Sequence, residues 1–254
     1  MDAVKHLSQW ATALPPAPPR GNAHRALDAV ARRSRSEKQA IRLSARADGA
    51  YSERIMNDPA VALGFELSLP EWAAAELRAL AGRAFATVED RVRLTISLAR
   101  ANFERDTGGP FGAAVFDEDT GRLVSIGVNR VVPTRCSTAH AEVMALSLAQ
   151  QATGTHDLGG PGQPARQLVV NWCPCAMCCG AVVWSGVRSI VIAGSGPELE
   201  QLTGFDEGPI HPDWAGELTR RGVRVVDGVL REESRQMFLD FARSGRPVYN
   251  ARKG

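Results

Sequence analysis

The chain has 254 residues, of which 44% are hydrophobic and 23% are charged, and its formal net charge is +2. This length and apolar content suit one large domain, or one medium domain with an appendage, and the small charge points to no particular partner. Five cysteines and no basic-then-apolar N-terminal segment argue against a secreted disulfide framework, so we expect a cytoplasmic protein.

Residues 1–84 are interpreted as an N-terminal extension, rich in Pro and Arg at first and then mainly helical. Its start carries Pro15, Pro16, Pro18 and Pro19, followed by a tract of eight Arg and Lys residues between Arg20 and Arg46. Such a tract can contact phosphates, but it lacks aromatic residues for base stacking. We therefore favour a solvated face or a docking arm over nucleic-acid binding. A new helix is expected to begin near Glu71, after Pro70.

Residues 85–254 alternate between helical and strand patterns. We predict a helix over 88–105, strands over 112–117 and 123–128 around a turn, and a helix after Thr138. A loop over 154–164 leads to a strand over 168–171 and a helix after Pro174. Strands over 189–193 and 223–226 and a helix over 231–243 follow. This alternation predicts an α/β fold with helices on both faces of a sheet.

The uncharged stretch over 167–187 is long enough to raise the question of a membrane span. It contains Asn171, Pro174 and Gly180, which suit a buried strand, turn and helix better. We expect no membrane association.

Four residues within these elements supply the parts of a catalytic zinc site: His140, Glu142, Cys175 and Cys178. Zinc favours Cys sulfur and His nitrogen in a tetrahedron, and three protein ligands leave the fourth position for water. Zinc lowers the pKa of that water to roughly 7. Glu142 lies two residues from His140 and could move a proton between this water and a leaving group.

Local patterns place the ligands at helix starts. Pro174 suits the first position of a helix, which would put Cys175 and Cys178 one turn apart on the same face. Thr138 suits an N-cap, which would put His140 and Glu142 in the first turn of the preceding helix. The two helix starts would then converge on one ion.

A structural zinc site is the alternative interpretation. Cys173 or Cys179 could close the coordination shell around zinc, leaving no open position and no chemistry. In that case Glu142 would have no catalytic role, because no water would be bound to the metal. Cys136 is expected to be a buried or loop thiol.

The motifs resemble the cytidine deaminase superfamily of zinc hydrolases, with H-x-E at 140–142 and P-C-x-x-C at 174–178. The resemblance covers about residues 86–250 and extends to the Gly-rich segment at 108–112 and to Asn129. It implies a three-layer α/β/α fold with a mixed five-stranded sheet and Zn²⁺ at helix starts. It implies His140, Cys175 and Cys178 as metal ligands and Glu142 as the catalytic proton carrier.

Substrate contacts are expected from further residues. Within the superfamily, Asn129 corresponds to a substrate-binding Asn, although a loop Asn is as often a turn residue. Phe111 and Trp184 could form walls for a planar base, or simply pack in the core.

Two segments resemble guanine deaminases in particular. Asp206 and Glu207 look like an acidic recognition segment, and Tyr249 looks like part of an aromatic tail that reaches an active site, often in a domain-swapped dimer. Carboxylates suit the N–H donors of a guanine edge. The family usually has Glu where this chain has Cys173, and Asp-Asp where it has Asp206 and Glu207.

We therefore predict a zinc-dependent aminohydrolase of a purine-like base or nucleoside, most simply of the guanine type, acting as a homodimer on a small amino-heterocycle. A tRNA adenosine deaminase and a cytosine or cytidine deaminase share the same motifs. A deaminase-like interaction domain with structural zinc is the non-enzymatic alternative.

Overall fold

The computed structural model describes residues 64–251. Its contacts divide the chain into two units, residues 1–65 and 66–254, and the account below concerns the second. The proline run and the basic tract lie outside the described residues. The domain boundary expected near residue 84 stays a prediction, although helix α3 (Glu71–Leu80) lies in the second unit and packs on strand β2.

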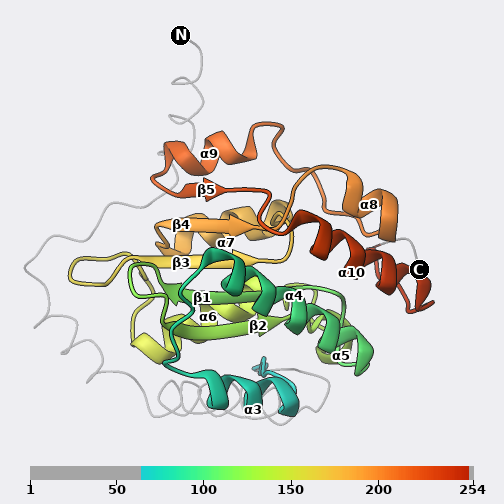
Figure 1. Ribbon diagram of the computed structural model, residues 1–254, viewed down its shortest axis with the longest axis horizontal. Coiled ribbons are helices and arrows are strands. Elements are labelled where there is room, and N and C mark those ends of the chain that lie inside the picture. Colours follow the sequence, from blue (N-terminus) through green and yellow to red (C-terminus); the bar gives the residue numbers. More distant parts are fainter. Residues whose placement is uncertain (1–63, 252–254) are drawn as a thin grey trace, which may run out of the picture. The chain divides into compact units, whose positions relative to one another are not determined.

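A mixed five-stranded sheet forms the centre of this unit (Figure 1). Its strands, in the spatial order β2-β1-β3-β4-β5, are β1 (Gly112–Asp117), β2 (Leu123–Val128), β3 (Arg166–Val170), β4 (Ser189–Ile192) and β5 (Arg224–Val226). β1 pairs antiparallel with β2 and β3, whereas the pairs β3–β4 and β4–β5 are parallel. The five-stranded mixed sheet implied by the resemblance is confirmed.

Helices cover both faces of the sheet. Helices α4 (Val88–Glu104) and α10 (Arg231–Arg243) lie on one face, and α6 (Ala141–Thr153) and α7 (Ala176–Ser185) lie on the other (Figure 1). Because β1, β3 and β4 are covered from both sides, every residue in them is buried, including the polar residues Asp117, Arg166 and Gln167. The three-layer architecture is confirmed.

Three short helices were not predicted: α5 (Val131–Thr134), α8 (Glu198–Thr203) and α9 (Trp214–Arg220). The uncharged stretch over 167–187 forms β3, a turn and α7, as expected. Within residues 64–251, no helix is long and apolar enough to cross a membrane.

Gly127 brings β2 close to α6. A Cβ at this position would lie 2.1 Å from the Ala141 carbonyl oxygen and 2.5 Å from the Ala145 nitrogen, both in the α6 backbone. We expect Gly127→Ala to lower the free energy of unfolding by about 1–3 kcal/mol, because α6 must move away from the sheet. Chemical denaturation measures this change.

Gly64→Ala is the matched control, because a Cβ at Gly64 meets nothing within 4 Å. It should change stability by less than about 0.5 kcal/mol. Equal unfolding midpoints for the two variants would show that α6 and β2 do not pack as described.

Candidate active site

The starts of α6 and α7 meet at one point. His140 immediately precedes α6 and Cys175 immediately precedes α7, and both have extended backbones, with ψ of 156° and 172°. Thr138 and Pro174 therefore lie outside the helices, and the prediction that they form the N-cap and first helical position is wrong. The Thr138 hydroxyl lies 3.2 Å from the Cys136 sulfur instead of capping α6. The predicted convergence of the two helix starts is present.

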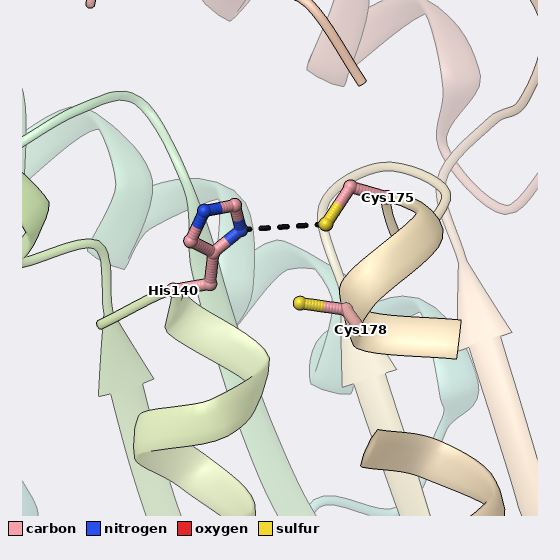
Figure 2. Close-up of side chains that lie close together, drawn as sticks. All are labelled: His140, Cys175 and Cys178. Carbon is pink, nitrogen blue, oxygen red and sulfur yellow. Dashed lines mark hydrogen bonds between the residues drawn. The ribbon is translucent and has the colours of Figure 1, made fainter. Parts of the chain in front are cut away.

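His140, Cys175 and Cys178 form a compact cluster of possible metal ligands (Figure 2). Their ligand atoms all lie within 4.8 Å of one another, and His140 Nδ1 lies 3.5 Å from Cys175 Sγ. Tetrahedral zinc with bonds of about 2.0–2.3 Å would hold neighbouring ligand atoms roughly 3.6 Å apart. The three side chains therefore fit a zinc ion with little movement.

The two cysteines differ in their readiness to lose a proton. A hydrogen bond from the Cys178 thiol lowers the pKa of Cys175 to about 4. Burial acts in the opposite direction, and a hydrogen bond with His140 lowers this pKa further. The same bond, together with burial, raises the pKa of Cys178. A thiolate is thus already favoured at Cys175, which is the form that binds metal.

Glu142 is the second residue of α6 and its side chain is buried, with 5% of the residue exposed. Burial, followed by the negative charge of Cys175, raises the pKa of Glu142 to about 6. A carboxyl group with a pKa in this range can both accept and donate a proton near neutral pH.

A cavity of about 450 Å³ opens onto this cluster. His140 and Glu142 line it together with apolar, aromatic and acidic side chains. The other lining residues are Phe111, Val131, Ser137, Val170, Trp172, Cys173, Phe205, Asp206, Glu207, Gly208, Tyr249, Asn250 and Ala251. Phe111 packs edge-on against Phe205 at 5.1 Å between ring centroids, which gives the cavity a firm aromatic wall.

The two acidic residues of the predicted recognition segment both line the cavity but differ in their surroundings. Asp206 is exposed, and its Oδ1 accepts the Gly208 backbone N–H at 2.9 Å, so it shapes the local turn. Glu207 is half-buried, and burial followed by the charges of Cys175 and Glu142 raises its pKa to about 8. Glu207 therefore lies in the electrostatic surroundings of the metal-ligand cluster.

Asn129 lies behind the cavity rather than in its wall. It is 1% exposed, its Oδ1 accepts the backbone N–H groups of Gly109 and Val131, and its Nδ2 donates to the Tyr249 hydroxyl. Tyr249 lines the cavity and belongs to the same chain. The structure thus links two of the predicted substrate-binding residues by a hydrogen bond.

Trp184 does not form a wall of this cavity. It lies on α7 with 82% of its surface exposed and lines a separate depression beside α9. Cys173 lines the cavity, but neither Cys173 nor Cys179 belongs to the ligand cluster found among residues 64–251. Trp172, Phe205 and Asn250 also line the cavity, and the sequence alone does not predict this.

Comparison with known proteins identifies the family. Residues 87–194 match the family described as the cytidine and deoxycytidylate deaminase zinc-binding region. The chain is also 30% identical over 158 residues to the tRNA-specific adenosine deaminase of Agrobacterium fabrum, covering 61% of this chain and 93% of that one. The chain belongs to the cytidine and deoxycytidylate deaminase family. It is therefore a zinc-dependent enzyme that removes an amino group by hydrolysis.

Other members of this deaminase family are also similar to the chain. The guanine deaminase of Bacillus subtilis is 29% identical over 125 residues, which cover 49% of this chain and 75% of that one. The solved structure of the guanine deaminase of Nitrosomonas europaea is 44% identical, with a TM-score of 0.68, and the match covers 72% of this chain and 98% of that one. A structure solved in complex with 2,6-diaminopurine is 45% identical, with a TM-score of 0.69 and coverage of 74% and 98%.

Proposed function

We propose that this deaminase converts guanine, or a closely related purine base, to the corresponding oxo compound with release of ammonia. The main support for this proposal is the position of Glu207, whose half-buried carboxyl group lines the same cavity as His140 and Glu142. The guanine deaminase of Nitrosomonas europaea, which the chain matches over nearly that protein's full length, supports the choice of guanine.

In this proposal His140, Cys175 and Cys178 hold zinc. When bound, zinc supplies a Lewis acid and a nucleophile derived from water at neutral pH. Glu142 accepts a proton from the attacking water, passes it to the ring nitrogen next to the reacting carbon, and then assists the departure of ammonia. The side chain is suited to this task by its burial and its raised pKa.

The remaining lining residues orient the base. A guanine ring presents N–H donors along one edge, and a carboxyl oxygen of Glu207 can accept a hydrogen bond from them. The Phe111 ring offers a flat apolar surface, and Tyr249 lines the cavity with its hydroxyl held by Asn129. Asp206 contributes by holding the turn that presents Glu207.

Substrate choice is tested by measuring kcat/KM for ammonia release from guanine, guanosine, adenine, adenosine, cytosine, cytidine and an adenosine-containing tRNA anticodon stem-loop. We expect guanine to be preferred over the adenine and cytosine compounds and the stem-loop by at least about a hundredfold, because a site built around a hydrogen-bonding edge rejects compounds that lack it. Preference for the stem-loop would assign the enzyme to tRNA, and preference for cytosine would assign it to pyrimidines. Either result would overturn the proposal.

We also propose that the enzyme works as a cytoplasmic homodimer. The resemblance to guanine deaminases and the exposed apolar side chains of Met177 and Trp184 on α7 support this assembly. Sedimentation of the purified protein measures the mass directly.

A further inference from the structure

The C-terminal tail, residues 244–251, returns from α10 to the active-site cavity and is tied down near its start. The Arg246 guanidinium donates to Asp106 Oδ1 at 2.7 Å and to the Glu104 carbonyl oxygen at 3.0 Å. Both partners lie at the end of α4, which packs on the sheet. These two hydrogen bonds therefore fix the position of Arg246, near the start of the tail, relative to α4.

Further along, the Asn250 side chain binds the backbone of the acidic segment, defined here as residues 204–208. Its Oδ1 accepts the Asp206 N–H at 3.0 Å, and its Nδ2 donates to the Gly204 carbonyl oxygen at 2.8 Å. The amide uses an acceptor and a donor on one short segment, so both the distance and the orientation of that segment are set.

The same segment is held from the core side by Phe205. Its ring is stacked on Phe241 at 5.6 Å and meets Tyr249 edge-on at 5.4 Å between centroids. The next residues, Asp206 and Glu207, lie outside any helix or strand. The Glu207 N–H donates to Glu200 Oε1 of α8 at 3.2 Å, and the Glu207 carbonyl oxygen accepts from the Ala176 N–H of α7 at 3.1 Å. Asn250 therefore holds the part of the segment that leads into Glu207, from Gly204 to Asp206.

We propose that Asn250 is a positioning residue for Glu207: it holds the acidic segment so that the Glu207 carboxyl group is presented to the amino-heterocycle. This inference rests on the proposed function, in which Glu207 recognises the base. Asn250 acts through the backbone because its side-chain oxygen and nitrogen bind Asp206 and Gly204. Glu142 is positioned by α6 and not by the acidic segment, so proton transfer should be largely unaffected by a change at Asn250.

Two readouts test the proposal in the full-length, zinc-loaded protein. Asn250→Ala should raise KM for guanine about tenfold, as expected for the loss of two hydrogen bonds, while kcat changes less than about threefold. Hydrogen exchange followed by mass spectrometry should show faster exchange in the peptide that contains Asp206. Asn250→Asp keeps the acceptor for the Asp206 N–H but lacks the donor, so both effects should be smaller than in Asn250→Ala.

Arg243→Ala is the matched control, because Arg243 lies at the exposed end of α10 and its ion pair is with Asp240 of the same helix. It should leave KM and exchange unchanged. Wild-type KM in Asn250→Ala would overturn the proposal, whether or not exchange rises. If the wild-type enzyme does not act on guanine, the proposed function fails, and unchanged exchange in Asn250→Ala would then separately reject the hydrogen-bonded link between tail and segment.

Discussion

Glu142→Gln should reduce kcat for ammonia release by about 10²–10⁴-fold while the protein still binds one zinc ion per chain. Glutamine keeps the size of the side chain but cannot accept and return a proton. Glu142 is buried beside the ligand cluster without belonging to it, so zinc affinity should persist. Steady-state assays together with elemental analysis measure the two quantities on the same sample.

Glu89→Gln is the matched control for this variant. Glu89 is the second residue of α4, as Glu142 is of α6, but its side chain is exposed. The control should retain wild-type activity. Turnover by Glu142→Gln equal to that of the wild type would remove Glu142 from the mechanism.

His140→Ala should lose zinc, and with it all measurable turnover. Mutation of a residue that only hydrogen-bonds to a metal ligand typically lowers metal affinity or activity about 10–100-fold. Loss of one of three direct ligands should lower zinc affinity further. The two cysteines left behind both lie at the start of α7 and cannot fix a catalytic geometry without His140. Zinc content after dialysis against a weak chelator gives the measurement.

Three further variants show whether this loss is specific. His156→Ala changes an exposed histidine in the loop after α6 and should keep its zinc. Cys173→Ser and Cys179→Ser should also keep one zinc ion, because neither thiol belongs to the ligand cluster. Loss of zinc from either cysteine variant would favour a closed, four-ligand structural site.

The elements that the sequence predicts well are those with a clear local signal. The strands at 112–117 and 123–128 have the predicted bounds because a turn rich in polar residues separates them. The helix at 231–243 has the predicted bounds because its apolar residues recur with the helical period. α5, α8 and α9 contain four, six and seven residues, too few for a period to emerge. Their positions depend on packing against distant parts of the chain.

The residues of the candidate site also differ in how well the sequence predicts them. Spacing within two motifs was enough to bring His140, Cys175 and Cys178 together, because each motif lies at one helix start. Trp184 was misassigned because proximity to a motif along the chain does not say which side of a helix a residue occupies. The role of Asn250 could not be predicted from a local motif, because its hydrogen-bond partners Asp206 and Gly204 lie 44 and 46 residues away along the chain.

The most direct test of the account is to follow guanine, xanthine and ammonia in one reaction with the zinc-loaded enzyme and with the same protein stripped of metal. We predict one ammonia released for each xanthine formed, activity that disappears on metal removal, and recovery when zinc is returned. A protein that holds one zinc ion per chain yet forms no xanthine and no ammonia would contradict the account.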